Sequence, residues 1–356
     1  MTASDTAPST KPSDDDYAYQ DHALQGVSRT FALTIPELPE SLRLVVGNAY
    51  LLCRIADTIE DAESLSVDDK KRLSEQFVEV VAGTADPAEF GRDAFARLGD
   101  DTLEAERDLV RNADRVLRIT YTFSDADRAA LLRCVRIMVD GMEQFQEGRF
   151  THGLRDEKQL DSYCYHVAGV VGEMLTELFC AHRPRIAERR AELERLAASF
   201  GQGLQMTNIL KDIWDDRSRN VCWLPQDVFE QEGFDLRRID HGRDEAAYQL
   251  ALGRLVASAA RHLENALAYT LLIPRSEQGI RQFCLWAIGM ALLTLRRINR
   301  RRDFASGSEV KISRRAVYAV VFISRMFGRS DLMLRRLFAL LARSLRQSKA
   351  PRPDTT

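Results

Sequence analysis

Apolar residues recur every three or four positions along most of this chain, a spacing that places them on one face of an α-helix. The strict alternation typical of β-strands is nearly absent, and Pro and Gly punctuate the ends of the periodic stretches. The pattern therefore predicts an all-α protein. The expected helices span residues 40–62, 67–82, 88–118, 125–148, 157–181, 185–219, 245–272, 275–300 and 313–346.

The same pattern predicts a single domain. Nothing in the middle of the 356 residues reads as a linker, so we expect one helical domain at residues 17–347. A leader at 1–16 and a tail at 348–356 are expected to be disordered, and the leader lacks the apolar core of a signal peptide. The longest apolar run, residues 283–295, is shorter than the roughly 20 residues of a membrane-spanning helix.

Two of the predicted helices carry a polar stripe inside an apolar sequence. The stripes consist of Tyr50, Arg54, Asp57 and Asp61, and of Gln205, Asn208, Asp212 and Asp216. Carboxylates one helical turn apart repel each other, and they are rarely buried without a partner. A solvated face is the usual explanation of such acids, but the apolar surroundings favour a cation between them. We therefore predict sites for a hard divalent cation such as Mg²⁺ that also binds a diphosphate.

Charge and cysteine content narrow the partners and the compartment. The chain has 50 basic and 53 acidic residues, a formal net charge of −3, so no nucleic-acid partner is expected. The six Cys form no CxxC pair and lie in apolar contexts. We predict that they are reduced core residues, which indicates a cytoplasmic protein.

The expected last helix, 313–346, is basic and amphipathic. We favour a terminal helix that packs on the bundle and exposes its arginines to solvent. The alternative is peripheral membrane contact, with the protein on the inner membrane face.

Five motifs in order resemble the squalene/phytoene synthase family. They are Ser28-Arg29-Thr30-Phe31, the stripe from Tyr50 to Asp61, Asp140-Gly-Met142, Tyr163-Cys-Tyr-His-Val-Ala-Gly169 with Gly172, and the stripe from Gln205 to Asp216. Their order and spacing match the family from about residue 20 to about residue 325. In the C-terminal third, Phe283-Cys284 and Val310-Lys-Ile312 resemble the squalene synthase branch more than phytoene synthases.

The resemblance implies an isoprenoid synthase bundle with a central active-site cavity. The reaction it implies is head-to-head condensation of two farnesyl diphosphates through presqualene diphosphate, followed by reduction with NADPH to squalene. The implied magnesium ligands are Asp57, Asp61, Asp212 and Asp216. The implied substrate-binding residues are Ser28, Arg29, Phe31, Arg54, Gln205, Asn208 and Lys211. The implied catalytic residues are Tyr163, Tyr50 and Phe283.

Some of these roles have structural alternatives. Tyr163 is expected to help accept the proton lost during ring closure, but a hydrogen bond in a packed helix explains it equally well. Phe31, Phe283 and Trp286 are candidate walls for a carbocation, although Phe283 and Trp286 at this spacing are more often core residues.

One departure concerns the cofactor. The family usually has an Arg four residues before the Pro that follows the second acidic motif, and this chain has Val221 before Pro225. Either Arg219 or Arg217 would then supply the charge, or the contact is lost. Lys311 is the other candidate for an NADPH phosphate contact. Gly201-x-Gly203 is no dinucleotide fingerprint, because no strand precedes it, and it is expected to let helices pack closely.

Other functions remain open. A synthase of the same fold could give dehydrosqualene, hydroxysqualene or, from a longer substrate, phytoene. A chain-elongating prenyltransferase would need an Asp-Asp-x-x-Asp run, which the spacing of Asp57 and Asp61 does not provide. The non-enzymatic alternative is a helical assembly subunit that kept the bundle and lost turnover.

Overall fold

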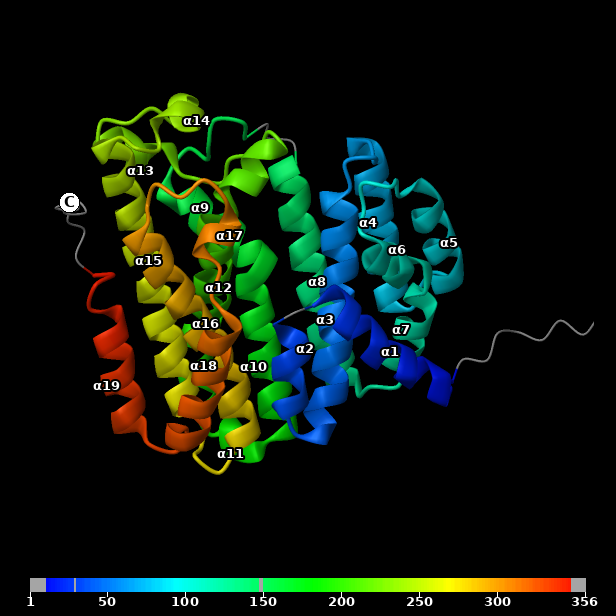
Figure 1. The fold of residues 1–356 in the computed structure, drawn as a ribbon. Coiled ribbons are helices and arrows are strands. Elements are labelled where there is room, and N and C mark those ends of the chain that lie inside the picture. Colours follow the sequence, from blue (N-terminus) through cyan, green and yellow to red (C-terminus); the bar gives the residue numbers. More distant parts are fainter. Residues whose placement is uncertain (1–10, 29, 147–149, 347–356) are drawn as a thin grey trace, which may run out of the picture. The chain divides into compact units, whose positions relative to one another are not determined.

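The computed structural model of this chain describes residues 11–28, 30–146 and 150–346, and every regular element in them is helical (Figure 1). One isolated bridge joins Leu154 to Pro225. The prediction of an all-α protein is therefore confirmed. By contacts the chain divides into two compact units, residues 1–143 with 177–182 and residues 144–176 with 183–356. They are called unit 1 and unit 2, and the prediction of one continuous domain stays a prediction.

Unit 1 is built around one buried helix, α3. Its elements are α1 (Asp14–Val27), α2 (Phe31–Thr34), η1 (Ile35–Glu37), α3 (Glu40–Asp61), α4 (Val67–Ala82), α5 (Pro87–Arg97), α6 (Glu104–Arg111), α7 (Ala113–Thr120) and most of α8 (Asp125–Gln146). Helices α1, α4, α6 and α7 all pack against α3. Helix α3 carries apolar residues on nearly all of its faces. A helix of this kind is buried because enclosing it removes the most apolar surface from water.

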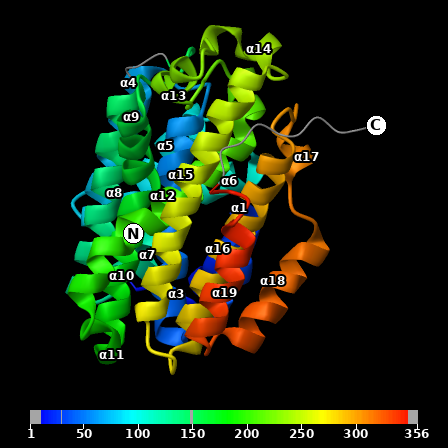
Figure 2. The same ribbon diagram turned by 90° about the vertical axis from the view of Figure 1, so that its left-hand side faces the viewer.

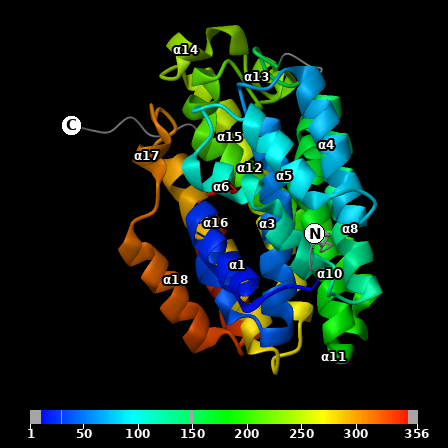
Figure 3. The ribbon, with the colours of Figure 1, turned by 90° about the vertical axis from the view of Figure 1, so that its right-hand side faces the viewer.

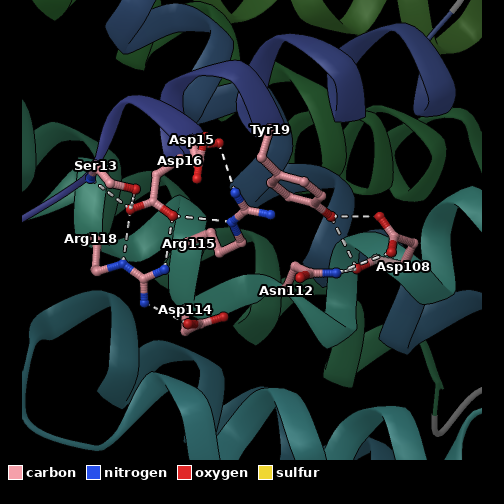
Figure 4. Close-up of polar contacts among 9 residues, drawn as sticks. All are labelled: Ser13, Asp15, Asp16, Tyr19, Asp108, Asn112, Asp114, Arg115 and Arg118. Atoms are coloured by element: carbon pink, nitrogen blue, oxygen red, sulfur yellow. Dashed lines mark hydrogen bonds and ion pairs between the residues drawn. The ribbon is translucent and has the colours of Figure 1, made fainter. Parts of the chain in front are cut away.

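The first helix begins earlier than the sequence indicated. Residues 13–16 of the expected leader form its start: Ser13 precedes the helix, and its backbone N–H donates to the Asp16 carboxylate at 2.9 Å. Asp16 is buried and accepts hydrogen bonds from Arg115 and Arg118 of α7, at 3.1 and 2.8 Å (Figure 4). The Tyr19 hydroxyl donates to Asp108 at 2.8 Å. These contacts fix α1 on α6 and α7; residues 1–10 lie outside the described part.

The expected helix 88–118 is wrong as a single element, because the structure divides it into α5, α6 and α7. The break after α5 has a tertiary cause. The Asp101 carboxylate accepts the backbone N–H groups of Glu63 and Ser64, at 2.8 and 3.2 Å, and so draws the intervening loop toward the end of α3. No pattern within residues 88–118 reports that contact.

Unit 2 is a bundle around the long helix α12. Its elements are α9 (Glu157–Cys164), the π-helical turn η2 (Tyr165–Gly169), α10 (Val170–His182, whose last turns belong to unit 1), α11 (Pro184–Ala187), α12 (Arg190–Ser218), α13 (Gln226–Gln231), η3 (Leu236–Arg238), α14 (Ile239–Gly242), α15 (Ala246–Leu272), α16 (Gln278–Arg300), α17 (Gly307–Val310), α18 (Arg314–Phe327) and α19 (Asp331–Ala342). Helices α15 and α16 run beside α12, as Figure 2 shows.

Glycines set the closest helix contacts of unit 2. A Cβ atom on Gly201 would lie 1.9 Å from the Ala168 carbonyl oxygen, and one on Gly172 would lie 2.1 Å from that of Ala197. On the α15 side, a Cβ on Gly203 would lie 3.0 Å from His262. The prediction that Gly201-x-Gly203 allows close helix packing is confirmed. The six Cys are also free and buried, as expected.

The expected helix 313–346 is two helices, α18 and α19. The chain turns at residues 328–330, where the Ser330 N–H donates to the Phe327 carbonyl at 2.8 Å and the Ser330 hydroxyl caps α19. Helix α18 packs on α16 (Figure 3). Helix α19 packs on α15 and α16. Within the described residues, none of the helices has the length and apolar character needed to cross a membrane.

Candidate active site

The polar stripe of α3 forms a charged cluster in unit 1. Arg54 donates to the Tyr50 hydroxyl at 3.3 Å, and its guanidinium lies 3.9 Å from Asp57. It also lies 3.6 Å from Glu106, which α6 contributes. Glu106 lies close to Arg54 because α6 packs directly on α3. The stripe that the sequence predicted is therefore present and extended by one acid.

Asp57 is the electrostatic centre of this cluster. Its side chain keeps 32% of its surface exposed, yet burial, with the neighbouring Asp61 and Glu106, raises its pKa to about 7, and Arg54 only partly opposes this. Burial and the charge of Asp61 likewise raise the pKa of Glu60. The carboxyl groups thus outnumber the two cations that act on them, Arg54 and Lys70, and a bound divalent ion would relieve this condition.

The segment before α3 adds an aromatic and hydroxyl group to the stripe. The Ser28 hydroxyl accepts the backbone N–H of Phe31 at 2.9 Å, and the Phe31 ring lies 5.2 Å from that of Tyr50. The Tyr50 hydroxyl donates to the Val27 carbonyl at 3.3 Å, which ties α3 to the end of α1. Ser28, Phe31, Tyr50 and Arg54 are thus neighbours, as the motifs suggested. Arg29 lies outside the described residues.

The second acidic stripe lies near the end of α12 in unit 2. Lys211 pairs with Asp212 at 3.0 Å, and Arg219 pairs with Asp216 at 2.7 Å. Burial, with Asp215 as a further acid, raises the pKa of Asp212. Gly307 of α17 lies against the stripe, since a Cβ there would be 3.3 Å from the Asp212 carboxylate. Gln205 is half-buried and Asn208 is exposed on the same helix.

The two candidate arginines after this stripe differ in their partners. Arg217 is 15% exposed, pairs with Asp240 at 2.8 Å and donates to the Thr151 carbonyl at 2.7 Å. Arg219 is 44% exposed and lies beside Asp216. The structure therefore favours Arg219 as the cation that faces solvent at this end of α12. Lys311, the other candidate, is exposed after α17.

Tyr163 lies in an aromatic cluster in unit 2. Its ring stacks on Trp223 with centroids 4.0 Å apart, and Phe145 meets it edge-on at 5.1 Å. The π-helical turn η2 begins two residues later, and such turns are frequent at functional sites. His166 in that turn forms a hydrogen bond with the Ser162 carbonyl at 2.8 Å.

Phe283 and Trp286 are both buried in α16. The Trp286 indole N–H donates to Gln282 at 2.9 Å, and Arg325 of α18 lies over its ring at 5.4 Å. Trp286 therefore has a defined packing role between α16 and α18.

Three residues of the site were not identified from the sequence: Glu106, Phe145 and Trp223. Glu106 comes from a segment whose many charged residues do not single it out, and Phe145 precedes the motif of Tyr163 by many residues. Only Trp223 carried a signal, as an aromatic residue two positions after the departure at Val221.

Each acidic stripe offers carboxylate oxygens that could hold a metal ion. In the described residues, no set of three or more His, Cys, Asp or Glu side chains is arranged to hold a metal ion. Magnesium suits this arrangement, because it commonly binds one or two carboxylates and completes its shell with water and substrate phosphate. The oxygen donors of Asp57 and Asp61 therefore fit magnesium bound together with a diphosphate.

Known proteins resemble this chain over most of its length. The squalene synthase of Gibberella zeae is 27% identical over 300 residues, which are 83% of this chain and 61% of that protein. The chain thus spans about three fifths of the length of the curated relatives it matches. The solved complex of TcSQS with the ligand BPH1237 has a TM-score of 0.74 and 25% identity, and covers 92% of this chain and 91% of that one.

A dehydrosqualene synthase solved with a ligand shares the fold, with a TM-score of 0.65, 19% identity and coverage of 89% of this chain and 97% of that one. The family model described as squalene/phytoene synthase matches residues 24–316, which include both acidic stripes and the Tyr163 motif. This chain belongs to the squalene/phytoene synthase family.

Proposed function

We propose that this protein condenses two farnesyl diphosphates head to head through presqualene diphosphate and reduces the product to squalene with NADPH. Family membership and the squalene synthases among its relatives support the reaction class. The observation that carries the proposal is the stripe of α3. There Arg54 and two carboxylates lie one turn apart on a helix that is otherwise buried and apolar.

The first task of the residues is to bind and ionise an allylic diphosphate. Magnesium on Asp57 and Asp61, and on Asp212 and Asp216, supplies positive charge to the leaving diphosphate when it is bound. Arg54 and Lys211 add charge-assisted hydrogen bonds to phosphate oxygens, and Arg29 has the same role. Ser28 donates a hydroxyl hydrogen bond, while Gln205 and Asn208 orient the ligands of the second stripe.

The second task is to handle a carbocation without admitting water. The Phe31 ring lies beside that of Tyr50, which has Arg54 over it, and aromatic faces favour positive charge. Tyr163, held between Trp223 and Phe145, helps to accept the proton lost during ring closure. Phe283 lines the dry interior of unit 2.

NADPH would bind without a Rossmann unit, since the described chain is helical. Arg219 and Lys311 are the exposed cations that suit its phosphates. When bound, NADPH supplies the hydride of the reductive step.

Product analysis tests the proposal. The purified protein is incubated with magnesium and farnesyl diphosphate, with and without NADPH, and the extract is read by mass spectrometry. Squalene formed only with NADPH is the expected result. If farnesyl diphosphate is not consumed, the proposed function is wrong.

One observation favours a second candidate. Val221 stands where the family usually has an Arg, so this contact of the reductive step is either supplied by Arg219 or Arg217 or lost. If it is lost, the same experiment would give presqualene diphosphate or a dehydrogenated or hydroxylated C30 product regardless of NADPH. Phytoene would require geranylgeranyl diphosphate as the substrate. A non-catalytic subunit would instead show no thermal shift with magnesium and a farnesyl diphosphate analogue.

A further inference from the structure

Helix α18 is attached to unit 2 by one face. Ser324 is buried on that face, and its carbonyl accepts a hydrogen bond from Gln282 of α16 at 2.8 Å. Nearby, Val320 approaches Gly289 so closely that a Cβ on this glycine would lie 2.6 Å from it. Arg325 lies over the ring of Trp286. The helix is therefore firmly packed, and its orientation on α16 is defined.

The opposite face of α18 is apolar and exposed. Tyr318, Phe322 and Met326 are 72%, 61% and 56% exposed, and they follow one another at a spacing of four residues. Residues at this spacing lie on one side of a helix. Arg315 and Arg329 flank this row at its two ends. These five residues are called the α18 face. Helices that pack in a core do not leave three large apolar side chains in a row in water.

The charge around this face has one sign. Between residues 311 and 330 the sequence contains no Asp or Glu, and it contains Lys311, Arg314, Arg315, Arg325 and Arg329. The neighbouring helix α19 adds exposed Leu332 and Leu340 together with exposed Arg335 and Arg336. Its one acid, Asp331, is neutralised by ion pairs with Arg275 and Arg281. An apolar row bordered by arginines matches the interface of a bilayer, where apolar side chains enter the acyl boundary and arginines meet anionic headgroups.

We propose that the α18 face docks on the surface of an anionic lipid bilayer, with the helix lying in the plane of the interface. Its charge complementarity to anionic headgroups selects this occupant. A symmetric dimer through this face would bring the positively charged arginines of the two copies close together. Their repulsion disfavours such a dimer. The proposal does not depend on the proposed reaction, because it rests on the exposure and charge of α18 alone.

Vesicle binding of the full chain tests this proposal. The probes are extruded vesicles of phosphatidylcholine alone and of phosphatidylcholine with phosphatidylglycerol, read by co-sedimentation. We expect binding to the anionic vesicles, little binding to the neutral ones, and weakening with added salt, because screening reduces the attraction of the arginines. Absence of binding to anionic vesicles would overturn the proposal.

Two pairs of substitutions separate the apolar and the electrostatic contribution. Phe322→Ser with Met326→Ser, and Arg315→Glu with Arg329→Glu, should each lower the affinity for anionic vesicles by about tenfold or more. Leu103→Ser and Arg237→Glu are the matched controls, since both residues are exposed and lie outside α18 and α19. The controls should bind like the parent protein.

Folding and self-association are measured in parallel. Exposed positions should leave circular dichroism and thermal unfolding unchanged. If the variants bind vesicles as the parent does, the α18 face is not the docking surface. If ultracentrifugation shows that the parent self-associates and that Phe322→Ser with Met326→Ser abolishes this, a second copy is the occupant and the proposal is wrong.

Discussion

Tyr163 and Trp223 stack with their ring planes 10° apart and their centroids 4.0 Å apart, although one lies on α9 and the other follows α12. Phe145 closes the cluster from the end of α8. A stacked neighbour restricts the rotation of a tyrosine ring, so the direction of the Tyr163 hydroxyl depends on residues remote in sequence. Trp223 is therefore a positioning residue for the family motif that contains Tyr163.

Replacing Trp223 tests this dependence. Trp223→Leu should lower turnover of farnesyl diphosphate by about a hundredfold, because a displaced reacting group costs that much, while Trp223→Phe keeps most of the activity. The substrate KM should change little in both variants. Phe234→Leu is the control, since it removes a buried aromatic residue of the same unit that packs on Phe229 and Tyr248 and not on Tyr163. Equal losses of turnover in Trp223→Leu and Phe234→Leu would mean that only stability is affected.

The acidic stripes should be required for the first chemical step. Asp57→Asn or Asp216→Asn is expected to reduce presqualene diphosphate formation by at least about a hundredfold, because charge stabilisation of the leaving group is lost. Circular dichroism should show an intact fold. Asp100→Asn serves as the control, because this acid is fully exposed and forms its ion pair with Arg107, which belongs to neither stripe. Full activity of both stripe variants would refute the magnesium assignment.

The raised pKa of Asp57 makes cation binding depend on pH. With its pKa at about 7 in the metal-free protein, this carboxyl must lose a proton before it can bind magnesium at lower pH. The apparent magnesium affinity should fall about tenfold for each pH unit below 7 and level off above it. Magnesium titrations of thermal stability, made in steps of about half a pH unit from about pH 5.5 to about pH 8.5, measure this slope. A flat profile would contradict it.

The same shift predicts a stability effect without metal. A carboxyl whose pKa is higher in the folded than in the unfolded protein destabilises the fold as pH rises from its ordinary value of 3.8 to about 7. Asp57→Asn should therefore raise the melting temperature in the presence of EDTA, more at pH 8 than at pH 5. A pH-independent difference between the two proteins would show that Asp57 is not responsible.

The close contact at Gly201 predicts a large steric penalty. Gly201→Ala places a methyl group 1.9 Å from the Ala168 carbonyl oxygen, and the helices must separate to admit it. We expect a loss of about 3 kcal/mol in the free energy of unfolding, measured by denaturant titration. The control is Gly47→Ala on α3, where the nearest atom is 3.5 Å away and alanine should be neutral or stabilising.

The anchor of α1 predicts acid sensitivity. The guanidinium of Arg118, with that of Arg115, holds the pKa of Asp16 well below its ordinary value of 3.8. Its contribution to stability is complete above that value and is lost as the pH falls below it. Asp16→Asn should cost about 3 kcal/mol at pH 7 and much less near pH 2. Asp15→Asn, at the exposed neighbouring acid, should change little (Figure 4).

Local signals in the sequence predicted much of the fold. Helix 67–82 is correct at both ends because Ser66 caps one end and Gly83, in a left-handed conformation, closes the other. Helix 40–62 is correct within one residue. Helix 88–118 failed because its break depends on Asp101 and the backbone of Glu63 and Ser64, a contact between segments that no local pattern encodes.

The candidate site follows the same division. Arg54 and Asp57 could be grouped from the sequence because one helix carries them at a fixed spacing. Glu106 could not be added from the sequence, because only the packing of α6 on α3 brings it near Arg54. Trp223 could not be paired with Tyr163, because only the course of the chain after α12 brings the two rings together. The pairing of Arg217 with Asp240, which separates it from Arg219, is likewise a tertiary contact.

The π-helical turn at residues 165–169 changes the directions of the side chains between the two parts of one helical segment. It holds one residue more than an α-helical turn would, so the side chains after it are rotated by about 100° relative to an uninterrupted helix. That rotation lets Tyr163 point toward Trp223 while Gly172 faces α12. A single-residue deletion here would restore a regular helix and still misdirect one of the two faces. The segment is therefore sensitive to changes in its length.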